Sequence, residues 1–405
     1  MFVAVARMVD PDGAGKSPLL VVGGRRGGRG VVCSASYEAR VFGVRSGMPI
    51  GQAERLCPAA MFVPVPRHEC GVKSREVRAV LEEWSPVVEP ASVDEFYLGL
   101  DGTEALYRHE PLAVTAARIR DDVMTRTGLT VSIGGGTNRL IAKLAVERAK
   151  PRPGTTGTGI LIVAGGAEAE FVATLALSDL PGVGPRFAEA LRRYGLVQVR
   201  DALGLDRGTL ASWFGPRTGA WLYDRIRGVS RTPVTPHAEA KSVSRESTFH
   251  VDLETDDALQ TELVRLVTRV CHDLRSDGLQ ARTITVKLRD FDFRTRQASR
   301  TLDAAVSSDR AVLPVARELL QRLRDERRTG ARLLGVGFAQ LSPGERLVQL
   351  GLFPDAVVPP ETERDRAVAR VMDRIQERFG SEAIRPARLA SPPAHRGMIE
   401  DDGAG

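Results

Sequence analysis

Apolar runs and helical periods alternate along roughly the first 165 residues. Short apolar runs predict buried strands, and two of them flank a glycine-rich turn over 23–30, which predicts a hairpin. Strands and helices mixed around one sheet predict an α/β or α+β domain. The expected strands are 18–22, 31–35, 129–133 and 159–164, an extended segment covers 87–101, and the expected helices are 71–84, 111–127 and 138–150.

The pattern changes in the middle of the chain. Residues 171–230 contain no strand-like run and predict short helices joined by glycine-containing turns. Two prolines within 232–240 indicate a linker. After the linker a second, smaller α+β domain is predicted, followed by a proline-rich tail with one amphipathic helix over 364–379. The second domain has expected strands at 241–249, 282–290, 296–302 and 332–341, and expected helices at 256–277 and 310–328.

Composition narrows the class of protein. Hydrophobic residues make up 42% and charged residues 27% of the 405 residues, which is typical of globular proteins and excludes general disorder. No apolar run is long enough for a membrane span, and the opening apolar run is too short for a secretory signal. The four cysteines have no C-x-x-C spacing, which predicts reduced thiols in a cytoplasmic protein and no zinc site. The net charge of +6 mildly favours a polyanionic partner.

Two adjacent carboxylates, Asp94 and Glu95, follow a predicted extended segment. Neighbouring residues in a strand point to opposite faces, so a joint site here requires a turn or a strand end. Carboxylate oxygens are the ligands that Mg²⁺ prefers. A two-metal site for phosphoryl transfer usually needs more than two carboxylates. The segment predicts either a divalent-metal site or a solvated acidic turn.

A second candidate site is Ser36-Tyr37-Glu38-Ala39-Arg40, where an arginine lies one turn after an aromatic residue at a helix start. This arrangement suits a polyphosphate, and ordinary helix surface is the alternative. The other glycine-containing segments do not match phosphate-binding motifs. A strand follows the turn at 23–30, and Gly15-Lys16-Ser17 lacks the earlier glycine of a P-loop because position 10 is Asp10.

Two regions predict contact with nucleic acid. Gly182-Val183-Gly184 between short helices resembles a helix-hairpin-helix, in which glycines let backbone amides approach a DNA phosphate, although a plain interhelical turn is the alternative. Residues 178–232 around it carry nine arginines against five acids. In the second domain Lys287 and Arg289 alternate with apolar residues, so both share one sheet face. That face is either a salt-sensitive DNA surface or a solvated face.

Together these segments resemble the Y-family translesion DNA polymerases of the bacterial DNA polymerase IV type, from Met1 to Phe353. The tail motif Gln349-Leu-Gly-Leu-Phe353 is similar to the family's sliding-clamp peptide. The other segments that carry the resemblance, in order, are Ser36 to Arg40, Gly43-Val-Arg-Ser-Gly-Met-Pro49, Ser92-Val-Asp-Glu95, Lys150-Pro151 with Gly154, and Leu180-Pro-Gly-Val-Gly184.

The resemblance implies an α+β, right-hand polymerase that acts as a monomer on primed template DNA and deoxynucleoside triphosphates (dNTPs). Its activity would be error-prone, template-directed nucleotidyl transfer to a primer 3′-hydroxyl with two Mg²⁺ ions. The implied parts are the palm at 1–37 and 75–165, the fingers at 38–74, the thumb at 166–232, a linker at 233–240, the little finger at 241–342 and a tail at 343–405.

The resemblance also assigns residues. Asp94 and Glu95 would hold the magnesium ions and act in catalysis. Phe2 would form the steric gate against the ribose 2′-hydroxyl. The remaining assignments are Tyr37, Arg40 and Lys150 for the incoming triphosphate, Gly182, Val183 and Gly184 for the duplex backbone, and Gln349, Leu350, Leu352 and Phe353 for the sliding clamp.

The sequence departs from the family pattern at its front. Family members begin with a strand ending in Asp-x-Asp, whereas here Met1-Phe2 falls where the following aromatic pair belongs. We expect an in-frame upstream stretch that encodes this strand and its third metal-binding carboxylate. The alternative is a catalytically inactive DNA- and clamp-binding accessory protein in lesion bypass. A helix-hairpin-helix nuclease is a third hypothesis, which leaves Asp94, Glu95, Tyr37 and Arg40 without a role.

Overall fold

The computed structural model describes residues 1–151, 158–236, 240–344, 361–380 and 382–390. The chain forms two compact units, Met1–Ala238 and Glu239–Gly405. The boundary between them falls inside the segment expected to be a linker. The finer partition into palm, fingers, thumb and little finger stays a prediction.

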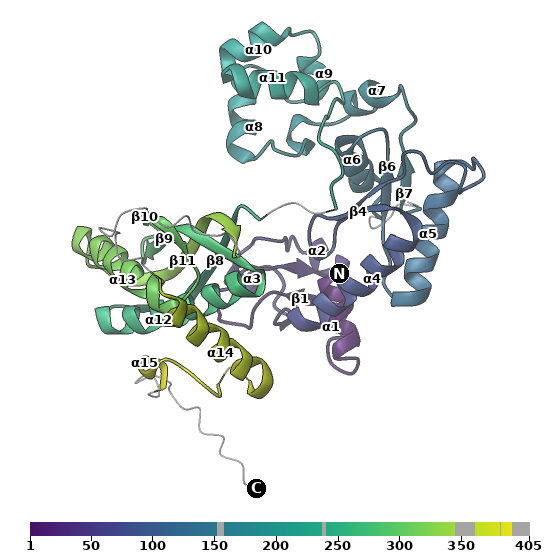
Figure 1. Ribbon diagram of the computed structural model, residues 1–405. Coiled ribbons are helices and arrows are strands. Elements are labelled where there is room, and N and C mark those ends of the chain that lie inside the picture. Colours follow the sequence, from purple (N-terminus) through teal and green to yellow (C-terminus); the bar gives the residue numbers. More distant parts are fainter. Residues whose placement is uncertain (152–157, 237–239, 345–360, 381, 391–405) are drawn as a thin grey trace. The chain divides into compact units, whose positions relative to one another are not determined.

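Unit 1 mixes short strands with helices (Figure 1). Its strands are β1 (Leu20–Val22), β2 (Ser34–Ala35), β3 (Met61–Val63), β4 (Val87–Pro90), β5 (Phe96–Gly99), β6 (Ile133–Gly135) and β7 (Ile160–Ile162). Its helices are α1 (Phe2–Val9), α2 (Tyr37–Val41), α3 (Ile50–Leu56), α4 (Arg67–Trp84), α5 (Leu112–Thr127), α6 (Arg139–Ala149), α7 (Glu168–Ala173), α8 (Pro185–Arg192), α9 (Val199–Ala202), α10 (Arg207–Phe214) and α11 (Pro216–Arg225), with a 3₁₀ turn at Leu177–Asp179.

Strand β1 is the buried centre of the first sheet of unit 1, whose order is β2-β1-β3. Its three residues are fully buried because Val21 packs into one apolar cluster and Leu20 and Val22 into another. The antiparallel pairing of β1 with β2 confirms the predicted hairpin, although β2 is shorter than expected. The parallel partner β3 was not predicted, because three half-exposed residues carry no clear period.

The other strands of unit 1 form two separate pairs, β4 with β5 and β6 with β7. The strand predicted over 129–133 is wrong, because Leu129 is buried without being in a strand and β6 begins only at Ile133. Helix α6 lies directly on β6. A Cβ at Gly134 would come within 2.1 Å of the Val146 nitrogen, so only glycine permits this approach.

Short helices make up the rest of unit 1, as predicted for 171–230. They enclose one apolar cluster that extends from α6 to α11. Helices α10 and α11 touch at Gly219, where a Cβ would lie 2.4 Å from the Ala211 nitrogen. Trp221 of α11 in turn lies against Gly182, in the loop before α8.

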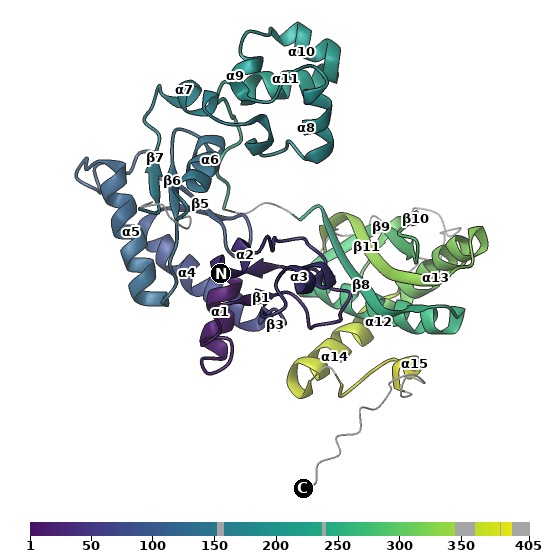
Figure 2. The same ribbon diagram turned by 180° about the vertical axis from the view of Figure 1, so that it is seen from behind.

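Unit 2 is a four-stranded antiparallel sheet of order β10-β9-β11-β8, with α12 and α13 against one face (Figures 1 and 2). The opposite face carries no helix among the described residues. The α+β prediction is confirmed for this unit, with strands longer than expected by a few residues. Its elements are β8 (Ser242–Leu253), α12 (Asp256–Ser276), β9 (Leu279–Asp290), β10 (Thr295–Val306), α13 (Asp309–Glu326), β11 (Ala331–Pro343), α14 (Glu363–Phe379) and α15 (Ala387–Ala390).

Helix α14, predicted over 364–379, is attached to the helical layer of unit 2 by buried charges. The Glu361 carboxylate accepts hydrogen bonds from the backbone amides of Ser307, at 2.9 Å, and Ser308. Arg275 donates to both carboxylate oxygens of Asp373 at 2.6 and 2.8 Å, and to Asp309 at 2.9 Å. These bonds make α14 part of unit 2 and not a free tail.

Two sequence expectations concern what the fold lacks. The four cysteines are all free thiols, as predicted. None of the helices in the described ranges combines the length and apolar character that a bilayer span requires.

Candidate functional site

Asp94 and Glu95 lie at the turn that joins β4 to β5. The backbone amides of Ala91 and Ser92 donate to the Glu95 carbonyl at 2.9 and 3.2 Å and close the turn. The Ser92 hydroxyl donates to the Asp94 carboxylate at 2.8 Å. Both acids are exposed, and they occupy the strand end that a joint site requires.

Helix α6 crosses this hairpin with a row of charged side chains. Arg139 forms an ion pair with Glu89 of β4 at 2.8 Å, and its guanidinium lies 4.2 Å from the centre of the Tyr97 ring. One turn further along α6, the Lys143 ammonium forms an ion pair with Glu95. Burial opposes the charge of Lys143, but the hydrogen bond to Glu95 together with the negative charges of Glu95 and Glu147 outweighs burial, and the pKa of the ammonium is raised.

Lys150 caps the C-terminal end of α6 and does not contact Asp94 or Glu95 directly in the described structure. Its ammonium lies 2.5 Å from the Glu147 carboxylate, which is also 3.9 Å from Lys143. Lys143 therefore stands between the acidic turn and the rest of this charged row.

The start of α1 packs in the same apolar cluster as α4 and the two strands that flank the acidic turn. Burial raises the pKa of the Cys70 thiol on α4, the N-terminal ammonium lowers it, and Glu69 and Asp94 raise it further. Phe2 is half-buried and packs between the cluster around α4 and the cluster around β1. Residue 2 and the acidic turn thus both neighbour α4.

Tyr37 and Arg40 lie together on the exposed side of α2. The Arg40 guanidinium is 5.5 Å from the centre of the Tyr37 ring, and its Nε donates to the Ala35 carbonyl at 3.1 Å. The buried Ser36 hydroxyl begins the helix by accepting from the Ala39 amide. In the described ranges no hydrogen bond or ion pair joins this pair to the acidic turn.

The chemistry of the acidic turn fits a hard divalent cation such as Mg²⁺. Asp94 has no cationic partner within the part of the chain that the structure describes, so its oxygens are available. No group of three or more His, Cys, Asp or Glu side chains suited to a metal occurs among those residues. Asp94 and Glu95 are therefore suited to only part of a coordination set, with water and a phosphate as the kinds of ligand that would complete it.

The loop before α8 carries two glycines, and their surroundings differ. Gly182 has φ +102° and faces Trp221, whereas Gly184 has φ −79° and open space where a Cβ would stand. The Val183 side chain is buried and its amide donates to the Leu180 carbonyl at 2.9 Å. Among the described residues neither glycine amide has a protein acceptor, so both can donate to an external anion.

The face of the unit 2 sheet opposite the helices is rich in hydroxyl groups. Lys287 and Arg289 lie on it as predicted, since Val286 and Leu288 point into the core. The net positive charge of this face is reduced, because Lys287 is paired with Glu246. Arg296 and Arg300 lie on the helical side, bonded to Asp290 and Glu318. Hydrogen bonds between Thr285 and Ser299, at 2.8 Å, and between Thr283 and Thr301, at 2.9 Å, complete the surface.

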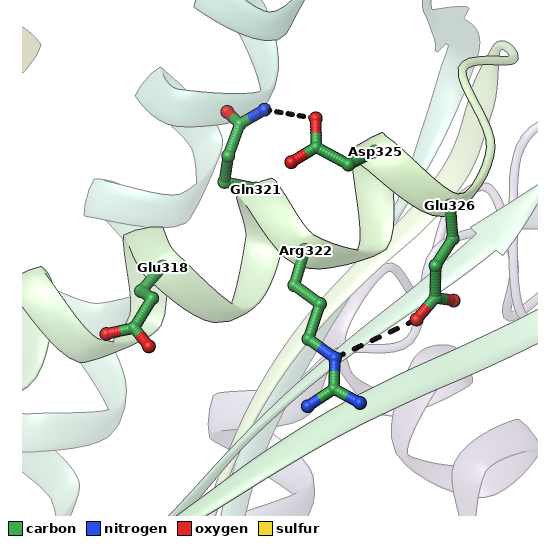
Figure 3. A pocket seen from close by; sticks show the side chains of 5 residues that line it. All are labelled: Glu318, Gln321, Arg322, Asp325 and Glu326. Atoms are coloured by element: carbon green, nitrogen blue, oxygen red, sulfur yellow. Dashed lines mark hydrogen bonds and ion pairs between the residues drawn. The ribbon is translucent and has the colours of Figure 1, made fainter.

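Two further regions yield no assignment. The predicted clamp motif, Gln349, Leu350, Leu352 and Phe353, lies outside the described residues. A shallow depression on α13 is lined by Glu318, Gln321, Arg322, Asp325 and Glu326 (Figure 3). Gln321 bonds to Asp325 at 2.8 Å and Arg322 lies 3.9 Å from Glu326, so these side chains pair along their own helix.

Sequence reasoning missed Lys143, Glu147 and Glu246. The first two had a signal, because residues 143, 147 and 150 are spaced to share one helix face. Glu246 had none, since its partner is set by the strand order of unit 2.

Comparisons with known proteins agree with the sequence resemblance. A family model described as "impB/mucB/samB family" matches residues 1–147, and one described as "impB/mucB/samB family C-terminal domain" matches 240–352. A DNA polymerase IV of Dehalococcoides mccartyi (strain CBDB1) is 33% identical over 390 residues, which covers 96% of this chain and 94% of that protein. A DNA polymerase IV of Streptomyces coelicolor is 39% identical over 344 residues, covering 84% of this chain and 69% of that protein.

A solved structure extends the agreement to the fold. A Y-family DNA polymerase chimera of Dbh and Dpo4 superposes with a TM-score of 0.73 at 24% identity, covering 84% of this chain and 96% of that one. The predicted α+β polymerase fold is confirmed. The family uses divalent metal, generally Mg²⁺, a hard cation of the kind that carboxylate oxygens such as those at 94 and 95 suit. The chain belongs to the impB/mucB/samB family, the bacterial DNA polymerase IV type of the Y-family DNA-directed DNA polymerases.

Proposed function

We propose that this chain catalyses error-prone, template-directed nucleotidyl transfer on primed DNA, in which the primer 3′-hydroxyl attacks the α-phosphate of a dNTP and pyrophosphate leaves. The observation that carries the proposal is the pair of exposed carboxylates at the β4–β5 turn beside a helix bearing Lys143 and Lys150. Carboxylates next to cations suit the binding of a divalent ion together with a polyphosphate, as nucleotidyl transfer requires.

The chain's residues divide the work between metal and nucleotide. Asp94 and Glu95 are assigned to two Mg²⁺ ions, which when bound stabilise the attacking and leaving oxygens. Lys150, with Tyr37 and Arg40, neutralises and orients the triphosphate. Phe2, half-buried at the start of α1, is assigned to the steric gate against a ribose 2′-hydroxyl.

Two surfaces are assigned to the duplex. The free amides of Gly182 and Gly184 donate to backbone phosphates, and Val183 holds the loop from inside. Lys287 and Arg289 follow the DNA backbone from the face of the unit 2 sheet opposite the helices. Both surfaces contact phosphates and not bases, so binding depends on salt and not on sequence.

A clamp tether and a cellular setting complete the proposal. Gln349, Leu350, Leu352 and Phe353 offer one amide and three apolar anchors, which suit a hydrophobic groove on a sliding clamp. The enzyme would act as a monomer in the cytoplasm, where its DNA substrate lies.

Primer extension with Asp94→Asn and Glu95→Gln tests the assignment. Each variant should lose several orders of magnitude in rate and retain DNA binding, because only the metal-binding oxygens change. Asp101→Asn, an exposed carboxylate in the next turn, is the matched control and should extend primers normally. The assay is run on the 405-residue chain and on a form extended upstream by an Asp-x-Asp strand. Near-normal primer extension by either variant contradicts the proposed site. If neither the 405-residue chain nor the extended form extends primers, the proposed activity is contradicted.

A further inference from the structure

One face of α6 and its C-terminal cap carries three charges, and a fourth from the acidic turn continues them in alternating order. Lys143, Glu147 and Lys150 are separated by four and three residues, so they share one side of the helix. Glu95 from the β4–β5 turn continues the row at the Lys143 end. The order along this row is Glu95, Lys143, Glu147 and Lys150, and we name these four residues the charge row.

The contacts in the charge row are unequal. Lys143 is bonded to Glu95 and lies 3.9 Å from Glu147, while Glu147 is 2.5 Å from Lys150. The Glu147 carboxylate thus lies between two ammonium groups, and the closer contact is with Lys150. The carboxylate oxygen that contacts Lys150 is the same one that lies 3.9 Å from Lys143.

We propose that Glu147 and Lys143 are positioning residues that couple triphosphate binding at Lys150 to release of Glu95 for its metal ion. The proposal rests on the proposed function, which assigns Glu95 to metal and Lys150 to triphosphate. It adds two residues that touch neither group and act through the charge row.

Electrostatics gives the direction of the coupling. A triphosphate competes with Glu147 for Lys150 and repels the Glu147 carboxylate. Glu147 then turns to the ammonium of Lys143, which is its other neighbour. Lys143 shares its charge with a second carboxylate, so its hold on Glu95 weakens and Glu95 can turn to a cation. In the absence of nucleotide the row keeps Glu95 engaged.

The strength expected is modest because the side chains are between a quarter and a half exposed. Ion pairs of this kind on helices change equilibria by about twofold. That is too small to matter for stability and large enough to measure in a binding cycle.

The test is a double-mutant cycle on Mn²⁺ binding without nucleotide or DNA, followed by the electron paramagnetic resonance signal of free Mn²⁺. Lys150→Gln removes the ion pair between Lys150 and Glu147, as a bound triphosphate is expected to do. Glu147→Gln removes the carboxylate that links Lys150 to Lys143. We expect Lys150→Gln to tighten Mn²⁺ binding by about twofold more in the wild-type background than in the Glu147→Gln background. The direct electrostatic effect of removing the Lys150 charge on Mn²⁺ affinity is the same in both backgrounds, so it cancels when the two changes are compared. An equal effect in both backgrounds overturns the proposal.

A second measurement separates this inference from the proposed function. If Asp94→Asn with Glu95→Gln leaves Mn²⁺ binding unchanged, the proposed metal site is wrong and the charge row is judged from its lysines instead. The chain has six lysines, so side-chain ammonium signals in nuclear magnetic resonance can be assigned one by one. Lys150→Gln should shift the Lys143 signal in the wild type and not in Glu147→Gln. An unmoved Lys143 signal overturns the charge row whatever the metal result.

Discussion

The Glu246 carboxylate on β8 and the Lys287 ammonium on β9 form an ion pair across the strand that separates them. Gly335 of β11 lies beneath the pair, where a Cβ would come within 2.8 Å of the Glu246 Cγ. The absence of a side chain at 335 lets the two charges meet. A cation assigned to DNA is therefore already neutralised within the protein.

Replacing Glu246 by glutamine should strengthen DNA binding. The substitution frees Lys287 to neutralise one more phosphate, so the slope of log K against log salt should steepen by about 0.9. Fluorescence anisotropy of a primed template across a salt series measures both affinity and slope. Glu318→Gln, which removes the same charge from the pair with Arg300 on the helical side, is the control and should leave the slope unchanged. An unchanged slope in Glu246→Gln contradicts the role of Lys287.

Replacing each of the two glycines in the loop before α8 by alanine should have different effects on stability and on DNA binding. Gly182→Ala adds a Cβ 2.7 Å from the Trp221 ring at a positive φ, and should cost about 1–3 kcal/mol of folding free energy. Denaturant unfolding followed by tryptophan fluorescence measures this loss, because all three tryptophans lie in unit 1.

Gly184→Ala should keep the stability of the protein and weaken DNA binding. Its Cβ meets no heavy atom within 4 Å, but it would stand on the surface assigned to a phosphate. Anisotropy with the same primed template measures the affinity. If Gly184→Ala bound DNA with wild-type affinity, the assignment of the Gly184 amide to a DNA phosphate would be contradicted.

The attachment of α14 should depend on pH through Asp373. Burial alone would raise the pKa of its carboxyl, but the bonds from Arg275 and His272 outweigh burial and lower it. A lowered pKa means that the stabilisation is complete above the ordinary value near 4 and is lost as the pH falls through the lowered value. Asp309 acts in the opposite sense, because burial raises its pKa.

Hydrogen–deuterium exchange of the α14 amides, corrected for the intrinsic rate at each pH, measures this dependence. Asp373→Asn should weaken the attachment by about 2 kcal/mol at neutral pH, because Arg275 loses a charged partner. It should also remove the difference between neutral and acidic pH that belongs to this residue. Equal protection of α14 in wild type and variant would mean that the carboxylate does not hold the helix.

Local pattern predicted the long elements well and the short ones poorly. Helices such as α5, α12 and α13 have many apolar residues in register, so their period is clear and their bounds agree within about two residues with those expected. Strand β3 has three residues and its existence depends on pairing with β1, which no local pattern encodes. The same holds for β6, where the approach of α6 selects glycine over apolar residues.

The candidate site divides along the same line. Asp94 and Glu95 stood out because their turn follows an apolar strand, and the turn is confirmed. Lys143, the partner of Glu95, could not be predicted, because its contact with the turn depends on where α6 crosses the hairpin. The pairing of Lys287 with Glu246 depends on the order of four strands and was out of reach for the same reason.

The strand order of unit 2 also has a consequence for synthesis of the chain on the ribosome. Among the described residues, the first strand of this sheet, β8, has β11 as its one neighbour, and β11 is the last of its strands in chain order. The hairpin of β9 and β10 can form early, whereas β8 must wait for the whole of α12 to α13 to emerge. Pairing between ends so distant in sequence is slow. Unit 2 should therefore reach its native state only after β11 has emerged from the ribosome, when unit 1 has already had time to fold.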